Sequence, residues 1–318
     1  MSSTDRPRPC RVVLSYNQPN LNQSEQDRMT NTTSTQTNQL EPTPEFDLCV
    51  LIPAYNEQSR IRSTLLDIIE TLAIWDCTAE ILVADDGSTD DTVQVCQSIF
   101  AEHRIDGNDR VLSLPQNMGK GAAVAHGLKN TRSRWTIMLD ADNSARMNQL
   151  PKLTVETESG DTHLVIGSRR MKTSEIQANI TRVIVGTIYG ITLRSLGLKL
   201  ANDTQCGFKL YSHHAAELIT RHTKENGFSF DIEHLLIAQH AGLAVPEIGI
   251  LWDHVDGSKV NPIIDGLKML GKIIKMRRPI RQSVPQTRLP RVSGLVLTGN
   301  AIPDAQIEFK PQSTLVGS

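Results

Sequence analysis

The feature that most constrains the fold is an alternation of short apolar segments and helical patterns, in which each apolar segment ends abruptly at polar residues. A continuous apolar run is typical of a parallel strand buried on both faces. Apolar residues that recur every three or four positions indicate amphipathic helices between these strands. The β-α-β-α-β-α-β order predicts an α/β fold with a mostly parallel sheet and helices on both faces. The apolar segments are Leu48–Ile52, Ile81–Ala84, Val111–Leu114, Trp135–Leu139 and Leu164–Ile166.

Polar side chains follow several of these strands at the point where each strand ends. Right-handed crossovers place the carboxyl ends of parallel strands at one edge of a sheet, and ligands of open α/β sheets bind at that edge. We therefore expect one convergent site there. Its members would be Tyr55, Glu57, Asp86, Asp140 and Asp142.

Two carboxylates, Asp140 and Asp142, end the fourth strand in the segment IMLDAD. Carboxylates this close repel each other unless a cation bridges them. Mg²⁺ and Mn²⁺ favour oxygen ligands, typically carboxylates together with substrate phosphates. The pair is therefore a candidate Mg²⁺ or Mn²⁺ site, and the alternative is a turn in which Asp142 caps a helix.

The loops after the first two strands carry side chains suited to a nucleoside. Tyr55, which follows Pro53, is placed to lie against a planar ring. Asp86 either caps the helix that begins near Thr89 or accepts hydrogen bonds from a base or ribose. Glu57 either caps the next helix or binds a polar group of the ligand.

Two cations are placed to bind an anionic group. Lys120 lies in the turn NMGKG just before a helix, where exposed amides favour anions. The turn lacks the spacing of a Walker loop, and no GxGxxG sequence follows a strand. Arg169 follows the strand at Leu164–Ile166 and suits a diphosphate. The alternatives are a glycine turn with a solvated lysine and a pair of surface arginines.

Composition predicts one folded domain between two tails. Residues 1–45 are polar, which predicts a disordered tail without a signal peptide or membrane span. Residues 46–278 are expected to form a single catalytic domain. Residues 279–318 are expected to form a loose extension with a short strand at 292–297. A net charge of −2 gives no electrostatic argument for nucleic acid as a partner. Five cysteines without a CxxC pair favour buried free thiols in a reducing compartment and no zinc site.

The series of motifs, taken in order, resembles glycosyltransferase family 2. The motifs are PAYNE, ADDGSTD, NMGKG, DADN, GSR, DTQCGFK, FDIE and W followed by GSK, and they span about Asp47 to Arg278. The later motifs resemble those of the polyprenyl-phosphate glycosyltransferases. DTQCGFK and FDIE are more similar to the dolichyl-phosphate β-glucosyltransferase branch than to the mannosyl branch, which has a glutamine at the position of Ser144.

This resemblance implies a GT-A, Rossmann-like fold and inverting transfer from a nucleotide-sugar donor. It implies that Asp140 and Asp142 bind the metal and that Arg169 contacts the phosphates. Together with the metal, Lys120 and Arg169 would stabilise the charge of the departing diphosphate. The expected nucleotide-sugar-binding residues are Pro53, Tyr55, Glu57, Ala84, Asp86, Lys120, Asp140 and Ala141.

The acceptor decides what else the site needs. A sugar hydroxyl requires a general base, for which Asp203, Asp231 and Glu233 are candidates. A polyprenyl phosphate is already anionic and requires cations instead, for which Lys209 and Lys259 are candidates. Asp231 and Glu233 are otherwise one exposed edge of a helix over residues 232–240. The expected catalytic residues are Asp140, Asp142, Arg169, Asp231 and Glu233.

Two segments suggest contact with a membrane. Asn261–Arg278 has the pattern of a basic amphipathic helix on an anionic membrane. Ile180–Leu200 is apolar but carries Arg182 and Arg194, which favours an interfacial position. The alternative for both is a helix facing the core. Relatives in this branch carry membrane anchors that this sequence lacks, so the expected location is cytoplasmic and peripheral on the cytoplasmic membrane face.

The sequence therefore predicts a metal-dependent inverting glycosyltransferase that moves glucose from UDP-glucose to a polyprenyl phosphate such as dolichyl phosphate. The alternatives are a GDP-mannose-dependent mannosyltransferase, a transferase acting on a sugar hydroxyl, and a non-catalytic nucleotide-sugar-binding protein. A phosphohydrolase of the haloacid dehalogenase type fits less well. Its Asp-x-Asp pair follows the first strand, where this chain has Pro53 and Tyr55.

Overall fold

The computed structural model describes residues 44–103, 108–169, 201–252 and 262–299. All of them belong to the unit Pro44–Ser318, whereas the tail predicted over residues 1–45 lies almost entirely outside the described residues. For residues 262–270 and 274 the backbone alone is described.

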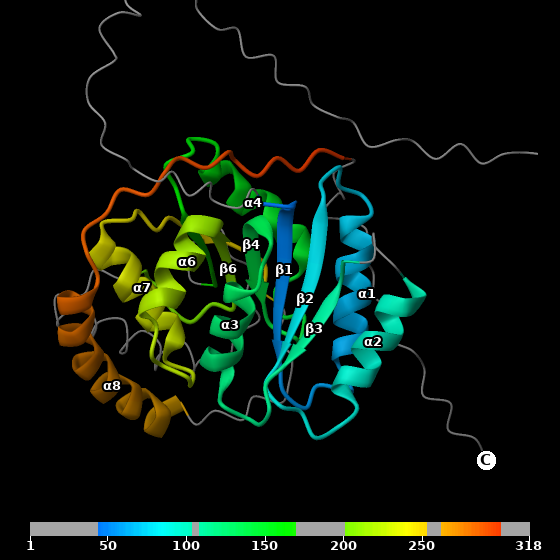
Figure 1. Ribbon diagram of the computed structural model, residues 1–318, viewed down its shortest axis with the longest axis horizontal. Helices are drawn as coiled ribbons and strands as arrows, with labels where there is room; N and C mark the ends of the chain where they lie inside the picture. Colours follow the sequence, from blue (N-terminus) through cyan, green and yellow to red (C-terminus); the bar gives the residue numbers. More distant parts are fainter. Residues whose placement is uncertain (1–43, 104–107, 170–200, 253–261, 300–318) are drawn as a thin grey trace, which may run out of the picture. The chain divides into compact units, whose positions relative to one another are not determined.

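The described strands form one sheet in the order β3-β2-β1-β4-β6-β5-β7 (Figure 1). β6 runs antiparallel to β4 and β5, and the other paired strands are parallel. The first four predicted strands and the strand at 164–166 are confirmed, and β6 and β7 were not predicted. The strands are β1 Phe46–Ala54, β2 Ala79–Asp85, β3 Arg110–Ser113, β4 Ser133–Leu139, β5 Leu164–Ser168, β6 Phe208–Ser212 and β7 Glu247–Gly249.

Helices cover both faces of the sheet, as the alternation predicts (Figure 1). α1, α2 and α4 contribute to one buried cluster, and α3, α6, α7 and α8 contribute to the other. The helices are α1 Ile61–Leu72, α2 Thr92–Glu102, α3 Lys120–Lys129, α4 Leu150–Thr154, α6 His213–His222, α7 Phe230–Ala241 and α8 Pro262–Ser283, with short 3₁₀ turns at Met147–Gln149 and Val155–Thr157.

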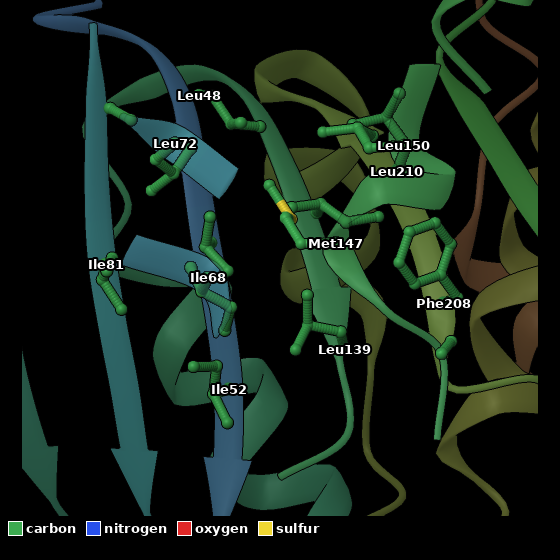
Figure 2. Close-up of a cluster of buried hydrophobic side chains, with 14 of the residues drawn as sticks. Leu48, Ile52, Ile68, Leu72, Ile81, Leu139, Met147, Leu150, Phe208 and Leu210 are labelled. Atoms are coloured by element: carbon green, nitrogen blue, oxygen red, sulfur yellow. The ribbon is translucent and has the colours of Figure 1, made fainter. Parts of the chain in front are cut away.

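Alternate side chains of strand β1 belong to the two buried clusters on opposite faces of the sheet. Leu48, Val50 and Ile52 belong to the cluster under α1, whereas Cys49 and Leu51 belong to the cluster under α3. Successive side chains of a strand point to opposite faces, so a strand buried on both sides has to be apolar at every position. Figure 2 shows the first cluster, in which β1 and β2 side chains meet those of α1, β4 and β6.

The segment after α8 packs against the domain instead of forming a loose extension. Val292 and Leu295 are buried, and the indole Nε1 of Trp135 donates to the carbonyl oxygen of Ser293 at 2.9 Å. In Figure 1 this segment runs along the end of the sheet. Within residues 284–299 the structure contains one isolated bridge, Gly299 to Trp75, and not the short strand expected at 292–297. Residues 300–318 lie outside the described part.

Helix α8 confirms the predicted helix, and its described apolar side chains favour the alternative of a helix that faces the core. Ile273 and Ile280 are buried in the cluster that α7 also lines. Lys272, Lys275 and Arg278 are exposed. Among the side chains that the structure describes in α8, Ile273 and Ile280 therefore face the core, whereas Pro279 is exposed. Of the helices that the structure describes, none is both long and apolar enough to cross a membrane.

Candidate functional site

A hollow of about 520 Å³ lies beyond the carboxyl ends of β2 and β3. Tyr55, which is 38% exposed, lines this hollow. Asp85, the last residue of β2, also lines it. The full lining comprises Tyr55, Asp85, Gly87, Ser88, Thr89, Asp90, Val93, Gln94, Ser113, Leu114, Pro115, Gln116 and Asn117.

The loops after β1 and β2 brace each other beside this hollow. Asn56 has a φ of 54°. Its backbone N–H donates to Ser88 Oγ at 2.9 Å, and its side-chain oxygen accepts from the Thr89 N–H at 2.8 Å. The Glu57 carboxylate accepts two hydrogen bonds from the Arg60 guanidinium, at 2.7 and 2.8 Å, and Glu57 is outside the lining of the hollow. Glu57 therefore orders its own loop.

Asp86 has a different place from either of those expected. It is buried, and its carboxylate accepts the backbone N–H groups of Met118 and Gly119 at 2.8 to 3.1 Å. It neither lines the hollow nor caps α2, which begins after Asp91. Gly119 has a φ of 105°, and a Cβ there would overlap with the carbonyl oxygen of Asn226. Asp86 therefore holds the NMGKG turn in place.

Pro53 and Ala84 lie opposite each other in neighbouring strands, and both are buried. Neither belongs to the lining of the hollow. Ala141 is also buried, and its carbonyl oxygen accepts from the hydroxyl of Thr64 at 2.7 Å. Pro53, Ala84 and Ala141 belong to the expected nucleotide-sugar-binding set. All three are buried at the strand ends, and none lines the hollow.

The acidic pair follows β4 at the same edge of the sheet. Asp140 forms an ion pair with Lys120, and their side chains are 24% and 25% exposed. Asp142 accepts the N–H of Ser144 at 3.0 Å, so this carboxylate turns back on its own loop. A Cβ at Gly207 would overlap with the carboxylate of Asp140. Glycine at that position therefore leaves the room in which the Asp140 carboxylate lies.

Charge and burial compete at Lys120. Burial lowers the pKa of its ammonium, but the carboxylates of Asp140, Asp231 and Asp142 raise it, and the net effect is a raised pKa. Lys120 is therefore a permanent cation at the acidic pair. A positive group held on Asp140 shows that this carboxylate suits a cation. Within the described residues, no group of three or more His, Cys, Asp or Glu side chains could hold a metal.

Arg169 lies beside this pair and is held from two sides. Its Nε and Nη2 donate to the two oxygens of Asp203, both at 2.8 Å, and its backbone N–H donates to Oδ2 at 2.9 Å. Its guanidinium carbon lies 4.9 Å from the centroid of the Trp252 ring. Burial lowers the pKa of Arg169, but Asp203 raises it more strongly. The guanidinium is therefore fixed, and the Arg169 side chain remains 31% exposed.

We expect Asp203→Asn to lower the rate of sugar transfer roughly tenfold to a hundredfold. The substitution removes one acceptor of the bidentate pair and leaves Arg169 free to rotate, and misplacement of a positioning group by about 1 Å costs on that scale. Steady-state kinetics on the purified variant measure this effect. Asp161→Asn, which removes a carboxylate from an exposed ion pair with Arg291, is the matched control. An unchanged rate in Asp203→Asn would show that the pair does not position Arg169 for the reaction.

The residues expected near the acceptor are largely buried. Lys209 is 0% exposed, forms an ion pair with Asp231, and donates to the carbonyl oxygen of Cys206 at 2.6 Å. Its assignment to an acceptor phosphate is therefore wrong in this structure. Burial raises the pKa of Asp231, and the ammonium groups of Lys209 and Lys120 oppose this shift.

Glu233 is buried as well. Its Oε2 accepts the backbone N–H groups of Lys224 and Glu225 at 3.0 and 2.9 Å. The alternative of an exposed helix edge is wrong for both Asp231 and Glu233, because each is about 5% exposed or less. Lys259 and the segment 180–200 lie outside the described residues.

Three groups at the site were not predicted: Asp85 in the hollow, Gly207 behind Asp140, and Trp252 against Arg169. Asp85 could not be told from its neighbour Asp86 in the sequence DD, and of the two only Asp85 belongs to the lining of the hollow. The motif DTQCGFK contained the signal for Gly207. The motif of a tryptophan followed by GSK contained Trp252, but nothing in the sequence placed its ring against Arg169.

Comparison with known proteins identifies the family. A model of "Glycosyl transferase family 2" matches residues 49–219. The chain belongs to glycosyltransferase family 2. The matched range begins in β1 and ends in α6, so it includes the hollow, the acidic pair, Arg169 and Gly207. This glycosyltransferase is an enzyme of the class that the motifs predicted.

Relatives of this glycosyltransferase include proteins named dolichyl-phosphate beta-glucosyltransferase. The protein from Dictyostelium discoideum is 33% identical over 247 residues, which cover 74% of this chain and 75% of the relative. The protein from Saccharomyces cerevisiae is 35% identical over 249 residues, covering 73% and 75%. The human protein is 31% identical over 238 residues, covering 71% and 73%.

Solved structures share the fold of this glycosyltransferase. Glucosyl-3-phosphoglycerate synthase of Mycobacterium tuberculosis is 22% identical with a TM-score of 0.51, over 81% of this chain and 91% of that one. The same enzyme in complex with Mn²⁺, UDP-glucose and phosphoglyceric acid gives 22% identity and a TM-score of 0.53, over 81% and 90%. These similarities confirm the GT-A fold that the sequence resemblance implied.

Proposed function

We propose that this glycosyltransferase moves glucose from UDP-glucose to a polyprenyl phosphate, with inversion at the anomeric carbon and with Mg²⁺ or Mn²⁺. The curated relatives are named for glucosyl transfer to dolichyl phosphate, and a solved structural neighbour was crystallised with UDP-glucose and Mn²⁺. The hollow at Tyr55 and Asp85 suits the nucleoside of such a donor.

The choice of acceptor rests on the three carboxylates that could act as a general base, because each of them is already bound to another group. Asp203 is bound to Arg169, Asp231 is paired with Lys209, and Glu233 accepts two backbone amides. A sugar hydroxyl needs a carboxylate to take its proton, whereas a phosphate is already an anion and needs none. Since each of these carboxylates is engaged and at most 5% exposed, a phosphate acceptor fits this site better than a hydroxyl.

The residues at the strand ends divide the work on the donor. Tyr55 would lie against the base, in the hollow that Asp85 also lines. Lys120 and Arg169 would bind the diphosphate, whose negative charge grows as the bond from the anomeric carbon to its oxygen breaks. The acceptor phosphate would attack from the opposite side, so an α-linked donor gives a β-linked product.

The acidic pair fits a divalent cation. Asp140 already holds a cationic group, and Gly207 leaves room for its carboxylate. Asp140 and Asp142 would supply the protein ligands, for which the Asp142 carboxylate would turn away from the Ser144 N–H. Diphosphate oxygens would complete the shell, as is common for Mg²⁺ sites. When bound, such an ion stabilises the charge on the leaving diphosphate. Asp140 and Asp142 would hold it.

A lipid acceptor requires contact with a membrane, and α8 offers a basic surface for it. Lys272, Lys275, Arg277, Arg278 and Arg281 are exposed, while Ile273 and Ile280 face the core. We therefore propose electrostatic attachment to an anionic membrane rather than insertion of the apolar side, each basic group near the surface contributing about 1 kcal/mol. A peripheral position on the cytoplasmic face is part of this proposal.

The test is transfer of radiolabel into an organic-extractable lipid. The full chain is incubated with polyprenyl phosphate and labelled UDP-glucose or GDP-mannose, with Mn²⁺ or Mg²⁺ supplied or chelated. We expect metal-dependent lipid label from UDP-glucose. Label from GDP-mannose alone would overturn the donor. Release of UDP with added sugars but without lipid label would overturn the acceptor, and binding of UDP-glucose without any turnover would indicate a non-catalytic protein.

A further inference from the structure

Four side chains of alternating charge lead from the interior of the sheet to the acidic pair. Lys209 pairs with Asp231, and Lys120 pairs with Asp140. The charge of Asp231 also acts on Lys120. In the order Lys209, Asp231, Lys120, Asp140, positive and negative side chains therefore alternate, and each interacts with its neighbours in the series.

Lys209 is unusual for its position. It lies in β6 between Phe208 and Leu210, pairs in register with Met138 of β4, and is fully buried. Loss of hydration at a buried ammonium costs several kcal/mol. An apolar residue would fill this position without that penalty, and departures from such local rules concentrate at functional sites. The ammonium fixes the carboxylate of Asp231 and the carbonyl of Cys206.

The first turns of α3 and α7 lie against each other, which brings Lys120 to the start of α7. A Cβ at Gly121 would be 2.8 Å from the Cβ of Phe230. The ammonium of Lys120 lies 5.9 Å from the centroid of the Phe230 ring. Lys120 is therefore placed between Asp140 on one side and the helix turn that carries Asp231 on the other.

We infer that Lys120 occupies Asp140 until a divalent cation takes that carboxylate, and that Asp231, fixed by the buried Lys209, then keeps Lys120 beside the diphosphate. This inference rests on the proposed function. Lys120 and the cation compete because both require the same oxygens and repel each other. Asp231 lowers the cost of exchange, since it offers the ammonium a second partner. Lys209 and Asp231 are positioning residues that act through Lys120.

The experiment measures Mn²⁺ affinity by electron paramagnetic resonance of free Mn²⁺, on the full chain at a UDP concentration that saturates each variant. The buried pair is replaced as a unit, Lys209→Met with Asp231→Asn, so that net charge is unchanged and no buried charge is left alone. Lys120→Met and the triple variant complete a double-mutant cycle. Asp161→Asn is the control for loss of a distant carboxylate.

We expect Lys120→Met to tighten Mn²⁺ binding about tenfold, because the group that competes for Asp140 is removed. We expect the variant with the pair replaced to weaken Mn²⁺ binding about tenfold, which corresponds to the interaction energy typical of residues in contact. In the triple variant the pair substitution should have no further effect. Equal weakening by the pair substitution with and without Lys120 would overturn the inference, as would unchanged or weaker binding in Lys120→Met.

The Lys120 side chain is 25% exposed, so Lys120→Met should fold and tests the competition by itself. Thermal unfolding shows whether the variant with the buried pair replaced has folded. Mn²⁺ binding by the unsubstituted protein without tightening in Lys120→Met would refute the inference alone. Failure of the unsubstituted protein to bind Mn²⁺ with UDP would overturn both the inference and the metal use in the proposed function.

Discussion

Asp142→Ala is expected to abolish sugar transfer while leaving the fold intact. Asp142 would supply one of two protein carboxylates to the cation, and loss of a group that stabilises the departing charge lowers rates by roughly a hundredfold to a thousandfold. The side chain makes one local hydrogen bond, to the N–H of Ser144 at 3.0 Å, so its removal should cost only about 1 kcal/mol of stability.

Asp142→Asn separates the two effects, because the amide oxygen can still accept the Ser144 N–H but carries no charge. We expect it to lose transfer as Asp142→Ala does while unfolding at the same temperature as the unsubstituted protein. Lipid transfer and thermal unfolding are measured on both variants. Retained activity in Asp142→Ala would refute the assignment of this residue to the metal.

Gly207→Ala is expected to lower transfer about a hundredfold through displacement of Asp140. The added Cβ would overlap with one carboxylate oxygen of Asp140 and lie 2.7 Å from the other. Either the carboxylate or strand β6 must move, and displacement of a catalytic group by about 1 Å costs on this scale. Mn²⁺ affinity should fall together with the rate, since Asp140 is a proposed ligand.

The chain offers a matched control in Gly271→Ala. A Cβ at Gly271 meets nothing within 4 Å, and the residue lies in α8. Alanine in a helix is favoured over glycine by up to about 1 kcal/mol, so this variant should be as stable as the unsubstituted protein or more so. If Gly207→Ala bound Mn²⁺ and turned over normally, the proposed role of Gly207 would be wrong.

The parallel half of the sheet could be predicted because its strands are apolar at every position and its helices recur with helical spacing. Strand β6 escaped prediction because its sequence FKLYS contains a buried lysine, whose partner Asp231 is distant in the chain. The C-terminal segment escaped because its two buried residues lie in extended backbone without a period.

The edge at which the site lies could be predicted, whereas the direction of each side chain could not. Asp85 and Asp86 are neighbours at a strand end, where successive side chains point to opposite sides. Sequence alone does not fix which of the two lies at the hollow, and in the structure Asp85 belongs to its lining whereas Asp86 does not. The engagement of Lys209, Asp231 and Glu233 likewise depends on contacts between distant segments.

The C-terminal segment also affects synthesis of the protein. The hydrogen bond from Trp135 to Ser293 joins residues 158 positions apart, and Val292 and Leu295 complete the cluster under α1. A nascent chain on the ribosome therefore exposes this apolar surface until residue 295 has left the exit tunnel. At about 5–20 residues per second, that interval lasts about 8 to 30 seconds after β4 has emerged. During it, we expect a chaperone that binds exposed apolar surface to have access to the growing chain.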